Sequence, residues 1–280
     1  MSKYGRKIVE YVFLIFLACI FVFPLVWMIV SSMKPEASIY LDMNSIKALL
    51  PSFSPSEWFQ TYKALFSRFN VLQYVWNSVF YAVIVTIGSI IVNGMAGYAF
   101  AKFQFRGKKF LFGLLLVLLI VPAETIIITQ FTVAHGIGVL NTRLAVVLPM
   151  MASMFFIYLF RNFFMAVPDE IIESVKLDGA NQWTIFWRIM LPMSKPAIAT
   201  VGTLSFIASW NDYLWPLMVL TDTSKFPLQV AITNINTTEP VYTNQVMAIL
   251  TVSTIPLIIV YIVAQKYILQ GLGGSGTGIK

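Results

Sequence analysis

"ESVKLDGANQWTIFWRIMLP", residues Glu173 to Pro192, is a polar stretch set between two strongly apolar ones. Just before it, Pro168 and the acidic residues at 169 and 170 are typical of a helix start, where the helix dipole favours negative charge. Gly179 suits the left-handed position that ends a helix. A second short helix is expected from about Gln182 to Met190, closed by Pro192 because proline cannot continue a helix. The stretch therefore predicts a helix, a glycine turn and a second helix.

This segment, about residues 166–195, leaves two interpretations open. Its first helix carries an apolar stripe, and its second helix has large apolar residues on one side. One interpretation is an amphipathic hairpin that lies on the membrane interface. The other is a rigid protrusion whose apolar stripe fills a cleft on a cytoplasmic partner, with Glu173 or Asp178 meeting a basic residue there. The apolar residues concerned are Ile171, Ile172 and Val175 in the first helix, and Trp183, Phe186, Trp187 and Met190 in the second.

The composition of the whole chain indicates a polytopic membrane protein. Of 280 residues, 58% are hydrophobic and 11% are charged, against about 25% charged residues in soluble domains. The single cysteine, Cys19, excludes a disulfide framework or a cysteine-rich metal site. The net charge of +7 is spread between the apolar runs rather than gathered on one face, so no nucleic-acid partner is expected. Membrane lipid is the expected solvent.

Six apolar runs are close to the roughly 20 residues that a helix needs to cross the hydrocarbon layer. We therefore predict an all-α membrane protein with six transmembrane helices in a single domain over residues 1–280, with core spans from about 74 to 268 and a tail at about 269–280. The first run is too long for a signal peptide and has no cleavage site after it. The expected spans are about Tyr11–Val30, Tyr74–Phe100, Phe110–Phe131, Leu144–Phe164, Pro196–Leu220 and Asn244–Ile268.

The distribution of basic residues predicts the orientation of the chain. Cytoplasmic connections carry an excess of Lys and Arg. With the N-terminus inside, most of the 19 Lys and Arg residues fall in the inner segments, including the polar segment 166–195. Both termini are therefore expected in the cytoplasm. Residues 31–73 are then an ordered outer loop with one short helix, and residues 221–243 a second, polar outer loop.

Polar residues inside apolar runs are candidates for a functional pathway, because a charge in hydrocarbon costs about 3 kcal/mol. One is Glu124, which follows Pro122. The others lie in the run "SWNDYLWPL" and combine hydrogen bonding with aromatic faces, as sugar recognition requires. The competing interpretation is structural, since such groups also join helices by hydrogen bonds. The pathway candidates are Glu124, Trp210, Asn211, Asp212 and Tyr213.

Other function classes stay open on the residues alone. A secondary transporter would use Glu124 or Asp212 as an ion or proton site, although no inverted repeat is visible. An intramembrane enzyme would use Asp212 with His135 as a catalytic pair, although no paired motif accompanies them. The chain has no phosphate-binding loop of the G-x-x-x-x-G-K-[ST] type, so it cannot power transport by itself.

A family resemblance favours the docking protrusion over the interfacial hairpin, and a transport subunit over the other function classes. The segment from Glu173 to Pro192 resembles the EAA loop of ABC-importer permeases, whose pattern is E-A-A-x3-G-x9-I-x-L-P. Ser174 and Val175 stand where two alanines are usual. "NSVFYAVIVTIGSIIVNGMAGYAFAKFQFRGKK", "NTRLAVVLPM", "SKPAIATVGTLSFIASWNDYLWPL" and "QKYILQGL" are also similar, in order, to carbohydrate-uptake permeases. Over about Asn77 to Leu272 the chain is similar to the MalG-type subunits of the maltose group.

The resemblance implies a type I ABC importer transmembrane domain in a bacterial or archaeal cytoplasmic membrane. It implies a MalF-like second permease, two copies of a MalK-like cytoplasmic ATPase and an extracytoplasmic solute-binding protein, with a sugar as substrate. ATP and Mg²⁺ would bind the ATPase, so this chain is expected to be a transport subunit that binds no cofactor itself. The residues implied to contact the ATPase are Glu173, Ser174, Asp178, Gly179, Ala180, Ile189, Leu191 and Pro192.

The tail "GLGGSGTGIK" has two interpretations as well. Its composition is that of a flexible linker. In MalG-type subunits the tail reaches between the two ATPase copies, which implies the same role for Gly271, Gly273 and Gly274.

Overall fold

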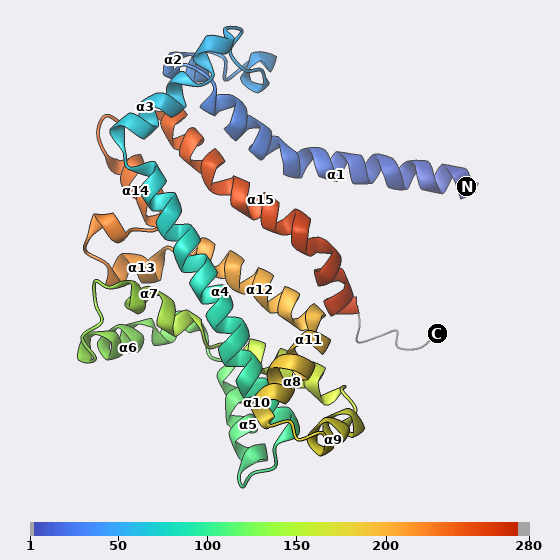
Figure 1. The fold of residues 1–280 in the computed structure, drawn as a ribbon. Coiled ribbons are helices and arrows are strands. Elements are labelled where there is room, and N and C mark those ends of the chain that lie inside the picture. The colour runs from blue at the N-terminus through green and yellow to red at the C-terminus, as the bar shows by residue number, and fades with distance from the viewer. Residues whose placement is uncertain (1–2, 274–280) are drawn as a thin grey trace. The chain divides into compact units, whose positions relative to one another are not determined.

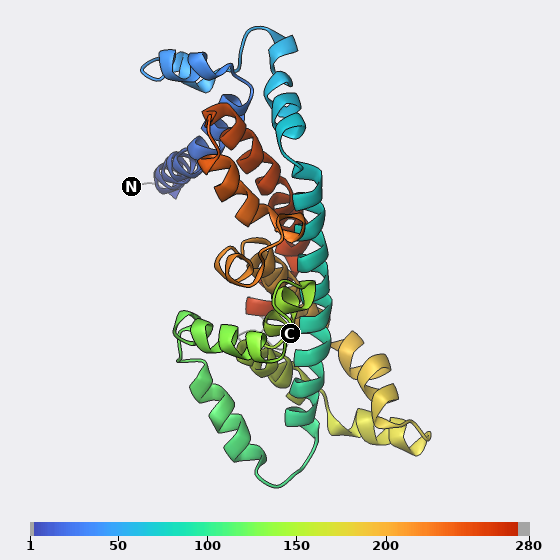
Figure 2. The ribbon, with the colours of Figure 1, turned by 90° about the vertical axis from the view of Figure 1, so that its left-hand side faces the viewer.

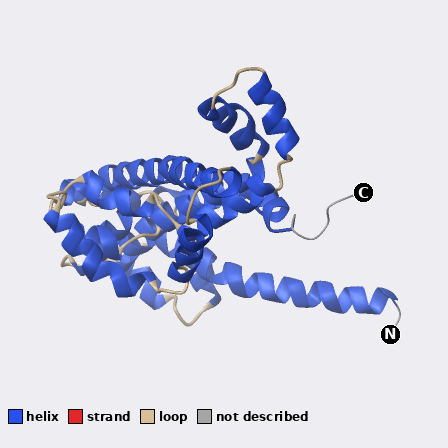
Figure 3. Ribbon diagram, turned by 90° about the horizontal axis from the view of Figure 1, so that it is seen from below, coloured by secondary structure: helices blue, strands red, loops and turns tan. Residues whose placement is uncertain are grey.

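A computed structural model of the chain describes residues 3–273. The described part is helical and contains no strand (Figure 3). Its contacts fall into two compact units. The first unit holds the chain up to Gln73 together with Ala231–Pro256, and the second holds Tyr74–Val230 and the chain from Leu257 onward.

In the first unit, residues 31–73, which the sequence predicts to be an outer loop, form an ordered segment. After α1 (Lys3–Ser32) come four short helices, where the sequence led us to expect one: α2 (Glu36–Leu41), η1 (Ile46–Leu49), η2 (Pro55–Glu57) and α3 (Gln60–Arg68). The carboxylate of Glu36 accepts hydrogen bonds from the backbone N–H groups of Thr243 (2.7 Å) and Asn244 (2.8 Å). It therefore caps α15 (Thr243–Gly273), whose first N–H groups have no partner inside the helix.

The second unit is arranged along one long helix, α4 (Val71–Lys102), which runs its length (Figures 1 and 2). Its other elements are α5 (Lys108–Leu118), α6 (Ala123–Gly136), α7 (Arg143–Met150), α8 (Met154–Met165), α9 (Asp169–Leu177), α10 (Gln182–Ile185), η3 (Phe186–Met190), α11 (Leu191–Met193), α12 (Lys195–Trp210), α13 (Leu214–Val219) and η4 (Thr223–Lys225). From Leu228 to Thr237 the chain forms α14, which passes into the first unit.

Two apolar cores lie along α4. Tyr81 and Val85 of α4 belong to the first, which includes Trp215 and Val219 of α13. Tyr98, near the other end of α4, belongs to the second core with the aromatic residues of α8. Within that core Phe160 and Phe164 stack at 5.6 Å between ring centroids. Helix α4 thus contributes buried side chains to both cores, one toward each of its ends.

Three of the expected spans are not continuous helices. The expected third span is broken between α5 and α6, the fourth bends by 47° between α7 and α8, and the fifth is broken between α12 and α13. By length and composition, three described helices are able to cross a membrane: Lys7–Ser32, Val71–Lys102 and Thr243–Gln265. A fourth span results if the bent pair α7–α8 counts as one. A hydropathy average does not register these breaks, because each is only three or four residues long and lies between strongly apolar helices.

The break between α7 and α8 is closed by a side chain of α4. Asn93 is fully buried, and its amide nitrogen donates to the carbonyl of Met151 (2.9 Å). Its Oδ1 accepts from the N–H of Ser153 (2.8 Å). Backbone groups inside a membrane must be satisfied by the protein. Asn93 therefore replaces the helical hydrogen bonds that the bend removes.

Close packing brings α4 within reach of this break. A Cβ added at Gly88 would lie 2.6 Å from the side chain of Met151, and one at Gly97 would lie 2.9 Å from the backbone nitrogen of Arg161. Small residues allow membrane helices to approach in this way. The two glycines set the distance at which Asn93 reaches across.

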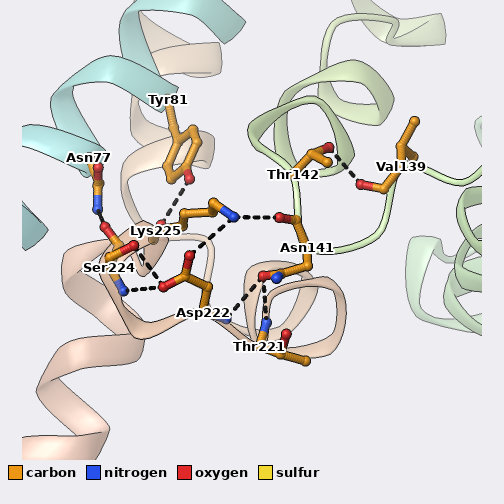
Figure 4. A network of polar contacts seen from close by, with 9 residues as sticks. All are labelled: Asn77, Tyr81, Val139, Asn141, Thr142, Thr221, Asp222, Ser224 and Lys225. Carbon is orange, nitrogen blue, oxygen red and sulfur yellow. Dashed lines mark hydrogen bonds and ion pairs between the residues drawn. The ribbon is translucent and has the colours of Figure 1, made fainter.

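A second polar network holds residues 219–228 against the first half of α4 (Figure 4). Asn141, at φ 57°, accepts through Oδ1 from the N–H groups of Thr221 (3.1 Å) and Asp222 (3.0 Å). The hydroxyl of Tyr81 donates to the carbonyl of Lys225 (2.8 Å). Hydrogen bonds from Ser224, with the Lys225 amine nearby, lower the pKa of Asp222 to about 2. The segment expected as a polar loop is therefore ordered, and it continues into α14.

We predict that Asn93→Leu destabilises the chain, because the carbonyl of Met151 and the N–H of Ser153, both in half-buried residues, lose their partner at nearly constant side-chain volume. Each buried group left unsatisfied costs about 1–3 kcal/mol. The thermal unfolding midpoint of the purified chain in detergent measures this. Asn162→Leu is the matched control, since Asn162 is exposed on α8. Equal midpoints for the two variants would contradict the assigned role of Asn93.

Candidate functional site: a helical hairpin fixed to the end of α4

The candidate site is the hairpin formed by α9 and α10. As predicted, α9 starts after Pro168, and Gly179 has positive φ (84°). The N–H of Gly179 donates to Lys176 O (3.0 Å), and the N–H of Ala180 donates to Val175 O (3.2 Å). These bonds satisfy carbonyls at the helix end. Asn181 then caps α10 by accepting from the N–H of Thr184 (2.9 Å).

Pro192 does not close the second helix, contrary to the sequence-based expectation. After α10 the chain makes one π-helical turn, η3, and Pro192 lies within α11, which leads into α12. Pro192 lies in the first turn of α11, where a proline has no helical hydrogen bond to lose. The hairpin is thus joined to α12 by a nearly continuous helical path.

The apolar stripe of the hairpin is buried against its own chain. Ile172, Ile185, Phe186 and Met190 are all at most 5% exposed. They pack with Tyr98 in the core that α4 and α8 share. For Ile172, Phe186 and Met190 the expectation that the stripe fills a cleft on a partner is therefore wrong, because these side chains attach the hairpin to its own chain. The large apolar residues of the second helix therefore differ in burial. Phe186 and Met190 are buried, whereas Trp183 and Trp187 are exposed.

Two polar contacts fix the hairpin to the end of α4. Lys102, whose side chain is 10% exposed, donates to the carbonyl of Val167 (2.6 Å) and forms an ion pair with Asp169 (2.6 Å). The hydrogen bond from Lys102 and its positive charge lower the pKa of Asp169. The hydroxyl of Tyr98 donates to the side-chain oxygen of Gln182 (2.8 Å). One residue of α4 thus holds the start of α9, and another holds the start of α10.

The exposed side of the hairpin, here called its tip, consists of residues 173–183 and includes the carboxylates of Glu173 and Asp178 and the ring of Trp183. Glu173, Ser174 and Asp178 are exposed, and Leu177 is 90% exposed. Neither Glu173 nor Asp178 has a side-chain hydrogen bond or ion pair within residues 3–273. Of the other residues implied by the resemblance, Gly179 and Pro192 are exposed, and Ala180, Ile189 and Leu191 are half-buried.

The pathway candidates fall in two places. Glu124 is exposed in the first turn of α6. The others lie at the break between α12 and α13, where Asn211 and Tyr213 are exposed and Asp212 is half-buried. Oδ1 of Asp212 accepts from the N–H of Trp215 (3.4 Å), and its Oδ2 is buried without a partner among the described residues.

Trp210 differs from its neighbours in this run. Its side chain is 1% exposed and its ring stacks on Phe206 at 5.9 Å between centroids, so its faces are covered within the chain. Within the described residues, no hydrogen bond or ion pair joins Asp212 to His135, and no cluster of three or more metal-ligating side chains is present.

Two of the three tail glycines lie within the described residues. Gly271 and Gly273 lie in the last turn of α15, which extends beyond the expected span end at Ile268. Each glycine lowers the stability of a helix by about 1 kcal/mol relative to alanine. The helix nevertheless continues through both glycines, because it is the end of the long helix α15. Gly274 lies outside the described residues.

Sequence reasoning missed the residues that fix the hairpin. In the sequence Lys102 is one of 19 Lys and Arg residues and follows the end of an expected span, and Tyr98 lies inside that apolar run, so neither is distinguished from its neighbours. Their partners lie 65 to 84 residues away in the chain. The one available signal was their spacing of four, which places both on one face at the end of a helix.

Comparisons with known proteins give a family. Residues 93–273 match the family described as "Binding-protein-dependent transport system inner membrane component". The arabinooligosaccharides transport system permease protein AraQ of Halalkalibacterium halodurans is 31% identical over 265 residues, covering 94% of this chain and 93% of that protein. The lactose transport system permease protein LacG of Rhizobium radiobacter is 29% identical, covering 96% of this chain and 95% of that protein.

Two further relatives widen this group. The sn-glycerol-3-phosphate transport system permease protein UgpE of Yersinia pestis is 35% identical over 201 residues, covering 71% of this chain and 72% of that protein. A crystal structure of a bacterial ABC transporter involved in the import of the acidic polysaccharide alginate has a chain that matches with a TM-score of 0.84 and 28% identity. That match covers 96% of this chain and 99% of the other.

We predict that Lys102→Met loosens the hairpin, because the buried carbonyl of Val167 and the carboxylate of Asp169 lose a shared donor. Amide hydrogen exchange in α9 should become several-fold faster, while exchange in α8 stays unchanged. Asp169→Asn should have a smaller effect, since Asp169 is 74% exposed and exposed ion pairs contribute little.

Lys176→Met is the matched control, because Lys176 lies on the same hairpin and has no ion pair within residues 3–273. Unchanged exchange in α9 of Lys102→Met would refute the fixing role of Lys102.

Proposed function

Because the chain belongs to the family of binding-protein-dependent transport system inner membrane components, we propose that it is the permease subunit of an ATP-driven ABC importer for a sugar or oligosaccharide. The observation that carries this proposal is the hairpin. Its apolar residues Ile172, Phe186 and Met190 are buried, its base is bound to α4, and its exposed side presents carboxylates that have no partner within residues 3–273. This arrangement suits a surface that receives force from a partner and passes it to the transmembrane helices.

The proposed partner at the hairpin is a cytoplasmic ATPase. Glu173 and Asp178 are the charged groups that would meet basic residues of that subunit, and Leu177 and Trp183 would supply apolar contact. Closure of two ATPase copies on ATP would move the hairpin. Because Lys102 and Tyr98 join the hairpin to α4, that movement would reach a helix that carries both cores of its unit. This is coupling by population shift between two states.

The remaining partners follow from the same proposal. A second permease would pair with this chain around a shared path, and an extracytoplasmic solute-binding protein would deliver the sugar. Both termini would lie in the cytoplasm of a bacterial or archaeal cell, which puts Lys102 and the hairpin on the inner side. The chain itself would carry no catalytic residue, and ATP and Mg²⁺ would bind the ATPase. Gly271, Gly273 and Gly274 would belong to a tail that approaches the ATPase.

We propose that the break between α12 and α13 lines the path. Asn211 and Tyr213 present exposed polar groups there, and between them lies Asp212, which is half-buried and whose Oδ2 is buried without a partner in the described chain, so a rearrangement of the break would be needed to expose it. A carboxylate at this position attracts hydroxyl donors and repels phosphate. It therefore suits a hydroxyl-rich sugar, as in the names of AraQ and LacG. Glu124 is the candidate from α6, with the same preference for hydroxyl donors.

An ion-coupled secondary transporter remains the alternative. It would use Asp212 or Glu124 as its ion site, and it would leave the exposed hairpin without a function. Uptake that stops when ATP is depleted but persists with an uncoupler supports the importer. The reverse result supports the secondary transporter.

We predict that Glu173→Lys reduces sugar uptake at least tenfold, because a basic group replaces the carboxylate that meets the ATPase. Uptake of radiolabelled lactose and of an arabino-oligosaccharide by cells that express the complete transporter is the measurement, and the amount of chain in the membrane should not change.

Glu170→Lys is the matched control, since Glu170 is an exposed carboxylate in the first turn of the same helix. It should transport nearly as well as the unchanged chain. Normal uptake by Glu173→Lys would exclude Glu173 from coupling.

A further inference from the structure

A large basic cavity lies at the start of α5, apart from the hairpin tip and the proposed path. Its volume is about 830 Å³, within the range of about 300–1,000 Å³ that is usual for ligand sites. Three of its lining residues are cations, Lys108, Lys109 and Arg161, and none is acidic. The rest are Gln104, Phe105, Gly107, Phe110, Phe112, Gly113 and Leu116. The cavity thus gathers positive charge among apolar and aromatic side chains.

Contacts within the chain hold two of these cations in place. The guanidinium of Arg161 lies over the ring of Phe112 (4.1 Å to the centroid), and its Nε donates to the carbonyl of Phe100 (3.3 Å). The amine of Lys108 donates to the carbonyl of Phe103 (2.7 Å). These partners are neutral, so they orient the cations without balancing their charge.

The amine of Lys109 and the terminal nitrogens of Arg161 are available to bind a ligand. Lys109 is exposed, and within residues 3–273 neither its amine nor the terminal Nη groups of Arg161 have a hydrogen-bond or ion-pair partner. Like charges that share one cavity repel each other, and a bound anion would relieve this repulsion. The chemistry of the cavity therefore selects an anionic ligand.

An apolar surface continues from the cavity along α5. Phe110, Leu114 and Val117 are 74%, 51% and 57% exposed, and their spacing places them on one side of the helix. Gly113 lines the cavity, and a Cβ added there would meet no atom within 4 Å. The cavity is therefore open at the point where the apolar surface begins. A ligand with a charged end and an apolar remainder fits both parts.

We propose that this cavity binds the headgroup of an anionic phospholipid of the inner leaflet, with its acyl chains along α5. The phosphate would lie among Lys109 and the Nη groups of Arg161. Basic pockets between helices on the cytoplasmic side of a membrane recognise lipid headgroups by this chemistry. The inference rests on the proposed function in one respect, since the proposed orientation places residues 102–109 at the inner surface.

The test is lipid binding by the full chain, purified with its partner subunits in detergent and titrated with phosphatidylglycerol under native mass spectrometry. Phosphatidylcholine tests whether the charge of the headgroup matters, and inorganic phosphate as a competitor tests for a soluble anion site. We expect a preference for phosphatidylglycerol that inorganic phosphate does not abolish. A lack of preference, or displacement by inorganic phosphate, would overturn the lipid assignment.

Two variants test the cavity by different means. Lys109→Gln removes a cation that has no structural contact and should weaken phosphatidylglycerol binding about fivefold. Gly113→Leu fills the cavity with all charges kept, and the open space at Gly113 allows the side chain to fit; it should weaken binding at least as much. The matched control is Arg106→Gln, in the same connection but outside the cavity lining, and it should bind as the unchanged chain does.

The site is refuted if both cavity variants bind normally, or if Arg106→Gln loses as much affinity as Lys109→Gln. The titration uses neither sugar nor ATP, so its outcome is independent of transport. The assumed orientation is checked separately by labelling Arg106→Cys, in a Cys19→Ala background, with a membrane-impermeant maleimide on intact cells. Labelling from outside would contradict the proposed orientation and the inner-leaflet assignment, while leaving the titration interpretable.

Discussion

The structure depends on the requirement that every backbone polar group in hydrocarbon finds a partner within the protein. This chain breaks its helices inside three apolar runs, so side chains must supply the missing hydrogen bonds. Asn93 does so at the bend between α7 and α8. Trp215 does so inside α7, where its indole N–H donates to the carbonyl of Ala145 (2.9 Å), whose helical donor position is taken by Pro149, which has no N–H. These contacts connect segments that lie 58 to 70 residues apart.

The hairpin follows the same principle at the end of α4. Lys102 satisfies the carbonyl of Val167 just before α9 begins, and it neutralises Asp169 in the first turn. The apolar residues of the hairpin then bury against α4 and α8. What remains exposed is a short acidic and aromatic tip. A rigid base and an exposed tip are the two properties that a surface for transmitting movement requires.

The sequence predicted those parts of the fold that depend on local pattern. Hydrophobic runs located α4 and α15, and Gly179 located the turn of the hairpin because only a residue without Cβ adopts positive φ easily. The helix breaks, the helical path through Pro192 and the burial of Ile172 were missed. The bend between α7 and α8 and the burial of Ile172 depend on partners far away in the chain, such as Asn93 for Ser153, and no local spacing records such a partner.

The central claim is that the exposed tip of the hairpin meets a cytoplasmic protein and not the membrane surface. A photoreactive residue at Leu177, which is 90% exposed, tests this directly in cells that express the complete transporter. We expect a crosslink to the ATPase subunit, and none when the same group replaces buried Ile172. Crosslinks from position 177 to lipid alone would contradict it and would identify the hairpin as an interfacial helix pair.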